Sequence, residues 1–225
     1  MRLNDIINES SDLDRKYRKE AETAYEELLR AFVSMGKEEG MKIKGNGLMA
    51  SREMLNHPED IGLVLFDQSM DRRASGGFSS EEFGYPVLYL FIDMDKDALM
   101  QMRSNEYKKT IVHEFIHSFD AYRMRVMRPT KDLPNDQYYN DPSESNAYYQ
   151  EAISHFEDQM NRIPARTRDM YMQKYGSDFE SFLELMSVML DDSFLKYKSV
   201  KTDRALKKRL YQYWDEEVRT GRAFD

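Results

Sequence analysis

Residues 113 to 117 read His-Glu-Phe-Ile-His and use two of the four histidines in the chain. On a helix, residues four apart lie one turn apart on the same face, so His113 and His117 can direct two imidazoles at one tetrahedral zinc ion. Glu114 lies about 100° around the helix, beside that ion. There it can take a proton from a water whose pKa zinc lowers from about 16 to about 7, so that the water attacks a polarised carbonyl. The pattern predicts peptide-bond hydrolysis with Glu114 as the general base.

The sequence around this pentapeptide has the period of an amphipathic helix, which we expect to run from about Glu106 to Arg125. Its apolar residues fall within about 140° of the helical wheel, while His113, His117 and Asp120 fall within about 60° on the other side. The apolar residues are Ile111, Val112, Phe115, Ile116, Phe119 and Tyr122. We therefore expect one buried apolar face and one face that carries the ligands.

A catalytic zinc usually takes three protein ligands, and three carboxylates compete for the third position. Glu144 is favoured because it begins the helix expected after Pro142, and the intervening chain is long enough to reverse direction. Glu151 lies on the same face of that helix but roughly 10 Å farther along its axis, so the two glutamates cannot bind one ion. Asp120 is third, because its short side chain is better placed to orient an imidazole than to reach the metal.

Two segments of the chain resemble a known family of metallopeptidases. Residues 112–120 and 143–147 are similar to the His-Glu-Leu-Ile-His-x-Tyr/Phe-Asp and Ser-Glu-Ile-Arg-Ala segments of the mitochondrial inner-membrane metallopeptidases that process an ATP-synthase subunit. They also resemble phage-encoded zinc metallopeptidases with Pro-x-Glu-x-x-Ala after the HExxH helix. The resemblance implies a minimal zincin fold of the gluzincin type, bound zinc, and Glu144 as third ligand. The chain lacks the cysteines of the mitochondrial family, so neither substrate nor biological role is implied.

Further candidates for the chemistry follow Glu144 on the same expected helix. Tyr148, Glu151 and His155 lie with Glu144 within about 60° of the wheel and form a polar stripe. Tyr148 or His155 could stabilise an oxyanion in the transition state. Most tyrosines serve as amphipathic packing, however, and His155 lies about 16 Å along the helix axis from Glu144. The two are therefore weaker candidates than the ligands.

Composition limits the classes of partner. The chain has 33 basic and 41 acidic residues, a net charge of −8, which argues against nucleic acid because phosphate binding needs a basic surface. The densest basic run, residues 207–209, is expected to be a solvated helix face. There is no cysteine, so disulfides and cysteine-ligated zinc are excluded and the ligands must be His, Asp or Glu. The expected partner is a peptide or protein substrate.

The sequence shows no signal for a membrane. Its best apolar run, residues 85–92, is far shorter than the roughly 20 residues that span a bilayer, and the N-terminus lacks a signal-peptide pattern. We expect a soluble, cytoplasmic protein. A phage origin, with action in the host cytoplasm or in the virion, fits the resemblance.

In the first half of the chain we expect one long helix and two strands. Ser11 and Asp12 can cap a helix that runs to about Gly36, with a buried stripe, and glycines 40, 45 and 47 follow it. The runs 61–66 and 87–92 are rich in strand formers, and by analogy with zincins the second is expected to be the edge strand that binds substrate. The polar segment 71–84 between them is expected to be an ordinary loop. The buried stripe comprises Ala21, Ala24, Leu28, Leu29, Phe32 and Val33.

The second half is expected to be helical. A helical stretch begins at Asp95 and is interrupted at Ser104-Asn105, and Pro129 and Pro134 force a non-helical connection after the metal helix. Helices are then expected over residues 142–162, 179–190 and 202–220. His57, in Asn-His-Pro, is expected at the surface.

The resulting prediction is an α+β, mostly helical, minimal zincin-like domain with a small sheet and additional C-terminal helices. Residues 1–225 form one metallopeptidase domain, with a metal-site core at about 86–162 and a helical extension at about 163–225. The alternative is a non-catalytic zincin-like scaffold, or a virion or interaction protein, whose metal is structural or absent. The retention of Glu114 favours the enzyme, because a non-catalytic descendant does not need it.

Overall fold

The structure, a computed structural model, describes residues 11–39, 48–50, 61–67, 76–79, 87–93, 97–120 and 133–224. Most of these residues are helical, and the strands form one small sheet, so the fold is α+β and mostly helical. The chain divides into two compact units, Tyr17–Val126 and Met1–Lys16 with Met127–Asp225. None of the described helices combines the length and the apolar character needed to cross a membrane.

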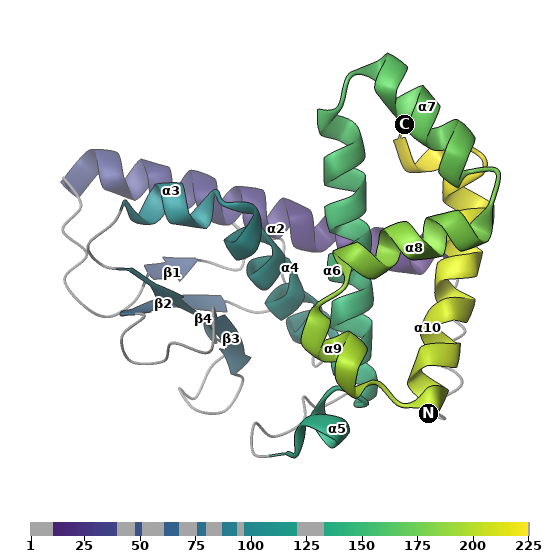
Figure 1. Cartoon of the computed structure of the whole chain (residues 1–225). Coiled ribbons are helices and arrows are strands. Elements are labelled where there is room, and N and C mark those ends of the chain that lie inside the picture. Colours follow the sequence, from purple (N-terminus) through teal and green to yellow (C-terminus); the bar gives the residue numbers. More distant parts are fainter. Residues whose placement is uncertain are drawn as a thin grey trace. The chain divides into compact units, whose positions relative to one another are not determined.

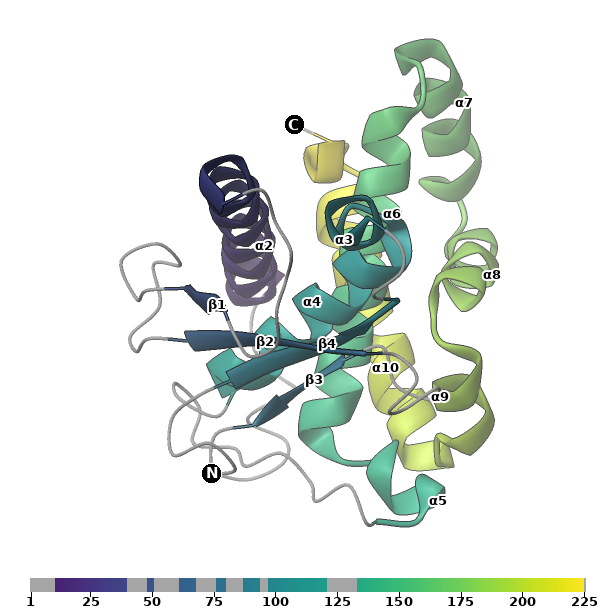
Figure 2. The same cartoon turned by 90° about the vertical axis from the view of Figure 1, so that its left-hand side faces the viewer.

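The unit Tyr17–Val126 contains a four-stranded mixed sheet in the order β1-β2-β4-β3 (Figures 1 and 2). β2 (Ile61–Asp67) and β4 (Val87–Ile92) are parallel neighbours in the centre, in register from Gly62 opposite Val87 onward. β1 (Leu48–Ala50) pairs antiparallel with β2, and β3 (Gly76–Ser79) pairs antiparallel with β4. The two predicted strands are thus confirmed, and each also pairs with a short antiparallel strand that was not predicted.

The strand β3 corrects two predictions. It lies within the segment 71–84 that was expected to be a loop, and it pairs with β4 on the side away from β2, so β4 is an inner strand and not the edge. Both glycines of β3 face close neighbours. A Cβ at Gly77 would lie 2.2 Å from the Tyr89 hydroxyl, and one at Gly76 would lie 2.7 Å from the Tyr89 carbonyl oxygen. Because only glycine fits at these positions, the strand lacks the β-branched residues by which strands are usually predicted.

Three helices belong to the same unit. α2 (Ser11–Glu39) confirms the first predicted helix, and of its expected stripe Ala21, Ala24, Leu28 and Leu29 are buried and Val33 is partly buried. α3 (Ala98–Met102) begins after Asp97, whose carboxylate accepts a hydrogen bond from the backbone N–H of Met100. α4 (Asn105–Phe119) begins after Ser104, which confirms the predicted interruption. The Tyr25 hydroxyl donates to the Met102 carbonyl oxygen at 3.0 Å and so ties α2 to α3.

The second unit is an assembly of helices (Figure 1). Its buried apolar residues form one core. α6 (Pro142–Arg162) and α8 (Phe179–Met189) have the predicted bounds to within a residue, and α10 (Val200–Tyr213) continues into a π-helical turn at Trp214–Val218. A 3-10 turn follows at Arg222–Phe224. The core is built from buried residues of α6, α8, α9, α10 and the π turn, among them Ile153, Phe156, Phe182, Met186, Phe194, Leu210 and Val218.

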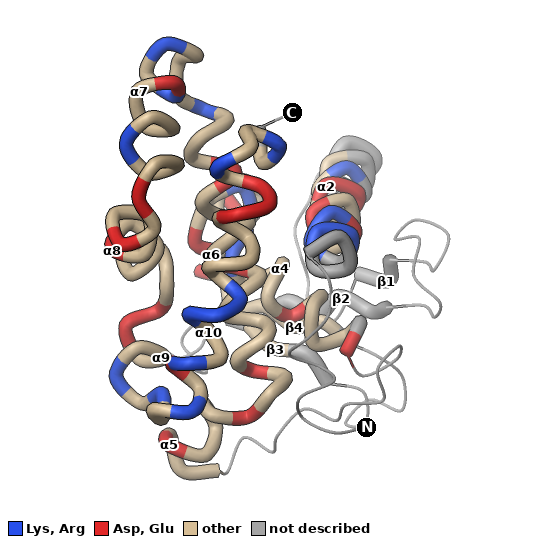
Figure 3. The backbone as a smooth tube through the Cα atoms, turned by 90° about the vertical axis from the view of Figure 1, so that its right-hand side faces the viewer, with Lys and Arg blue, Asp and Glu red and all other residues tan. Residues whose placement is uncertain are grey.

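Three shorter helices of this unit were not individually predicted: α5 (Asn135–Tyr138), α7 (Ala165–Tyr175) and α9 (Asp192–Tyr197). α5 begins directly after Pro134, so the connection that the prolines were expected to keep non-helical contains one helical turn. Lys and Arg positions are interspersed with Asp and Glu positions along α6 to α10 (Figure 3). The predictions for residues 40, 45, 47, 57, 95, 122 and 129, for the Phe32 and Phe119 side chains, and for the metal helix beyond Asp120 lie outside the described residues.

Candidate metal site

The helix that carries the pentapeptide is fixed to the sheet at its beginning. The Ser104 hydroxyl accepts a hydrogen bond from the backbone N–H of Tyr107 at 3.4 Å and so caps α4. The Tyr107 hydroxyl in turn donates to the carbonyl oxygen of Phe91 on β4. β3 passes close to α4. If Gly76 of β3 had a Cβ, that atom would lie 2.9 Å from Cγ2 of Thr110, which is one turn before His113 on α4. These contacts set the position of the histidine turn relative to the sheet.

His113 and His117 project from successive turns of α4, as the spacing predicts. Their Nε2 atoms lie 3.1 Å apart, and the rings meet edge to face at 74° with centroids 4.8 Å apart. The side chains are 6% and 1% exposed. The expected apolar residues Ile111, Val112, Phe115 and Ile116 are buried as well, so both faces of α4 are buried in this part of the helix.

Glu144 lies in the first turn of α6, whose beginning is strongly determined by the local sequence. The Asp141 carboxylate accepts a hydrogen bond from the Ser143 N–H at 2.8 Å, and Pro142 occupies the first turn, where a missing N–H costs nothing. The Ser145 hydroxyl donates to the Tyr139 carbonyl oxygen at 3.3 Å. The capped start places Glu144 in a defined orientation, and the residue has no exposed surface.

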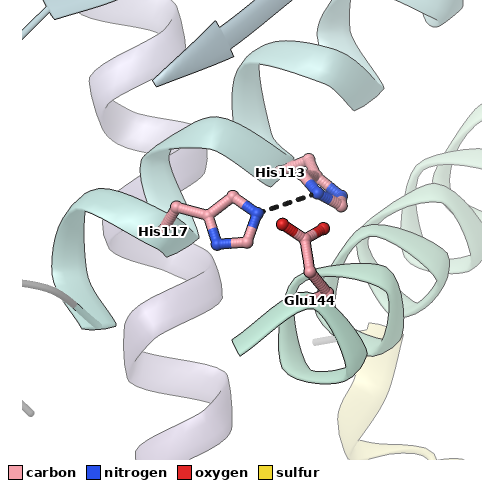
Figure 4. A group of neighbouring side chains, drawn as sticks. All are labelled: His113, His117 and Glu144. Atoms are coloured by element: carbon pink, nitrogen blue, oxygen red, sulfur yellow. Dashed lines mark hydrogen bonds between the residues drawn. The ribbon is translucent and has the colours of Figure 1, made fainter. Parts of the chain in front are cut away.

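The three residues form one group in the structure (Figure 4). The two imidazoles from α4 and the carboxylate from α6 point toward one another, with one ligand atom of each within 4.8 Å of the others. Among the described residues this is the one group of three or more His, Asp or Glu side chains with that geometry. Two nitrogens and a carboxylate, all buried, could hold a metal ion.

The other predicted residues lie outside this group. Glu114, next to His113 in the sequence of α4, is buried at 4% exposure. Asp120 is buried at the C-terminal end of α4, and its backbone N–H donates to the carbonyl oxygens of Ile116 and His117. Glu151 and His155 are half-buried on the second and third turns of α6 beyond Glu144.

Tyr148 is held by aromatic packing. Its ring stacks on Phe194 with centroids 5.0 Å apart and contacts Tyr139 at 5.7 Å. Burial, together with nearby Tyr138, Tyr139 and Glu144, raises the pKa of the Tyr148 hydroxyl well above the usual value of 10. The hydroxyl therefore stays protonated and able to donate, while the ring serves the core of its own unit.

Arg209 is a residue whose role the sequence did not reveal. It was expected on a solvated face with Lys207 and Lys208, which are indeed exposed, but Arg209 is half-buried. Its guanidinium lies 3.9 Å from the centre of the Tyr149 ring and donates to the Asn146 side-chain oxygen at 3.0 Å. The sequence of the basic run does not show which of its residues is buried. The burial of Arg209 depends on its contact with the Tyr149 ring, which comes from α6.

Comparison of the chain with models of protein families, with curated proteins and with solved structures found no match. The function of the chain is therefore inferred from the residues of the site and their geometry.

Proposed function

We propose that this protein is a zinc-dependent peptidase in which His113, His117 and Glu144 hold the ion and Glu114 is the general base. The proposal is supported by the buried group of two imidazoles and one carboxylate, and by the burial of Glu114, which follows His113 on α4. Three protein ligands with a fourth position left for water are the usual composition of a catalytic zinc site. The cytoplasmic location and the phage origin remain predictions from the sequence.

The donor set fits zinc in chemistry, and its two imidazoles also fit zinc in spacing. Imidazole nitrogen and carboxylate oxygen are both common zinc ligands, and the chain has no cysteine to offer instead. Two nitrogens at about 2.0 to 2.1 Å from a tetrahedral ion are roughly 3.3 Å apart. The observed separation of 3.1 Å between the two Nε2 atoms is close to that value. A bound zinc would polarise the substrate carbonyl and lower the pKa of the attacking water.

Glu114 supplies the proton transfers. Its place next to His113 on α4 puts its carboxylate about 100° around the helix from that imidazole. From there it can accept the proton of the attacking water and later give a proton to the leaving amine. Asp120, buried one turn from His117, is proposed to orient an imidazole and so to act as a positioning residue.

The substrate is proposed to bind along β3. In the described part of the sheet β3 pairs with β4 on one side alone, and Gly76 lets it run close to α4. An extended peptide can add to such an edge through backbone hydrogen bonds. This moves the predicted substrate strand from residues 87–92 to Gly76–Ser79.

A peptide-library cleavage assay tests the proposed function. Zinc-loaded wild type should cleave a subset of the peptides, and both chelation of the metal and Glu114→Gln should abolish those cleavages. Cleavage that persists in the Glu114→Gln variant would reject the mechanism. A library without any Glu114-dependent product would favour the non-catalytic scaffold.

A further inference from the structure

A cavity of about 230 Å³ lies within the unit that contains α6 to α10. It is walled by residues from the first turns of α6, from α9 and from the start of α10. Tyr149, Phe194 and Leu206 give it an apolar floor, and all three are buried. The cavity therefore has an apolar floor, and its wall includes the beginnings of two helices, α6 and α10.

The charged groups of the cavity are all of one sign. Lys201 and Arg209 line it, and the described residues that form its wall include no Asp or Glu, although the chain as a whole carries a net charge of −8. Asp203, nearby on α10, is bound to Lys198 at 3.1 Å and to Lys207 at 3.0 Å. The N-terminal end of α10 adds a partial positive charge at the same rim.

The two cations differ in how they are held. Arg209 is fixed by its contacts with Tyr149 and Asn146, so its guanidinium is in place before any ligand arrives. Lys201 is exposed and forms no ion pair or hydrogen bond within the described part of the chain. One preorganised guanidinium and one ammonium in the wall of a cavity with an apolar floor are complementary to an anion with an apolar body.

We propose that this cavity binds a small organic acid with a carboxylate attached to an aromatic or aliphatic body. A closed apolar cavity of about 150 Å³ holds one benzene molecule, so the larger volume here has room for a ring and a short chain. The body lies against Tyr149, Phe194 and Leu206, and the carboxylate meets the fixed guanidinium of Arg209, while Lys201 adds a second positive charge on the same wall. A carboxylate beside an apolar group occurs both in free organic acids and at the C-terminus of a peptide. The experiment below distinguishes these two kinds of ligand.

The cavity is separate from the metal group. On α6 the lining residues Pro142, Ser145 and Tyr149 lie about 100° to 160° around the helix from Glu144. The proposal does not depend on zinc or on peptidase activity. It can therefore be tested on metal-free protein, and it stands or falls independently of the proposed function.

The experiment is a titration of the metal-free, ¹⁵N-labelled full chain with 3-phenylpropionate, followed by NMR. The largest shifts are expected at backbone amides of the cavity wall, such as Phe194, Thr202 and Leu206. The uncharged 3-phenylpropionamide should bind at least about fivefold more weakly, as should propionate, which has no apolar body. A peptide that ends in a free Phe carboxylate replaces the acid in a parallel titration, and tighter binding of that peptide would assign the source to a protein C-terminus.

Variants complete the test. Lys201→Glu should weaken 3-phenylpropionate binding about fivefold or more, because it reverses a charge at the rim without removing a contact of the fold. Lys208→Glu makes the same charge change two turns along α10, outside the cavity, and should leave the affinity within about twofold. Ala205→Phe, which fills the cavity, should abolish binding. Equal affinity for acid and amide, shifts outside the cavity wall, or no binding of either acid form would overturn the proposal.

Discussion

The Nε2 atoms of His113 and His117 lie 3.1 Å apart on a buried face of α4. The Nε2 atoms are ring nitrogens of the kind that histidine offers to a metal, and their separation is close to that of two nitrogens bound to one tetrahedral ion. The arrangement supports one metal ion bound by both imidazole rings.

Glu114→Gln should retain zinc but lose activity. The amide keeps the size of the side chain and leaves the three proposed ligands in place, but it cannot accept a proton. We expect kcat/KM to fall by about 10² to 10⁴, measured on any peptide that the wild type cleaves. Glu106→Gln, an exposed position in the first turn of the same helix, should keep wild-type activity. A Glu114→Gln enzyme as active as this control would contradict the assignment.

Gly77→Ala should destabilise the sheet. Gly77 lies opposite Tyr89, and a Cβ there would overlap the tyrosine ring. We expect the free energy of unfolding to fall by about 1 to 3 kcal/mol, which is the usual cost of overpacking a buried site. Chemical denaturation measures this change.

The same clash predicts coupling between the two positions. In a Tyr89→Leu background the ring is absent, so Gly77→Ala should cost much less than in the wild type. Equal costs in both backgrounds would mean that the ring does not cover Gly77.

Asn140→Ala should destabilise the α6–α10 unit. The Asn140 side-chain oxygen accepts hydrogen bonds from the Ser199 N–H and the Thr202 hydroxyl, both at 2.6 Å, and its amide donates to the Tyr197 carbonyl oxygen at 2.9 Å. Its loss should lower the free energy of unfolding by about 1 to 3 kcal/mol. Asn161→Ala is the control, because Asn161 makes one weak contact, at 3.5 Å with Arg168, and should change stability by less than about 0.5 kcal/mol. Similar effects of the two variants would show that the Asn140 contacts contribute little.

Tyr148→Phe should alter how stability depends on alkaline pH. Because the pKa of Tyr148 is raised in the folded protein, its contribution is fully present below about pH 10 and is lost as the pH rises further, when the unfolded chain releases the proton and the folded chain does not. The phenylalanine keeps the ring stack but has no proton to release. Denaturation between about pH 9 and 11.5 should show a shallower loss of stability in the variant than in wild type. Parallel curves would contradict the buried position of the hydroxyl.

Where local sequence decides the conformation, the elements were predictable. α6 begins with an aspartate cap and a proline in its first turn, and it was expected from Pro142 to Arg162, as observed. β2 and β4 are dense runs of strand formers between breakers, and both were found. The histidine pair followed from helical spacing alone, since residues four apart must share a face.

Where contacts with a distant part of the chain decide the conformation of a segment, the sequence alone did not predict that conformation. The segment Gly76–Ser79 is a strand because β4 offers it hydrogen bonds and the Tyr89 side chain covers Gly77, and neither fact is visible in the local composition. The wrong assignment of β4 as the edge strand followed directly from missing β3. Glu144 was favoured for its place at a helix start, but its proximity to two histidines from another helix is a property of the folded chain.

Zinc content per chain shows whether His113, His117 and Glu144 form a metal site. Wild type, Glu144→Ala and Glu151→Ala would be purified without added metal, reconstituted with zinc, and measured by elemental analysis and by competition with a chelator. We expect near-stoichiometric zinc in wild type and in Glu151→Ala, and an affinity at least about a hundredfold weaker in Glu144→Ala. Zinc retained with unchanged affinity in Glu144→Ala, or absent from folded wild type after reconstitution, would show that these residues do not form the proposed zinc site.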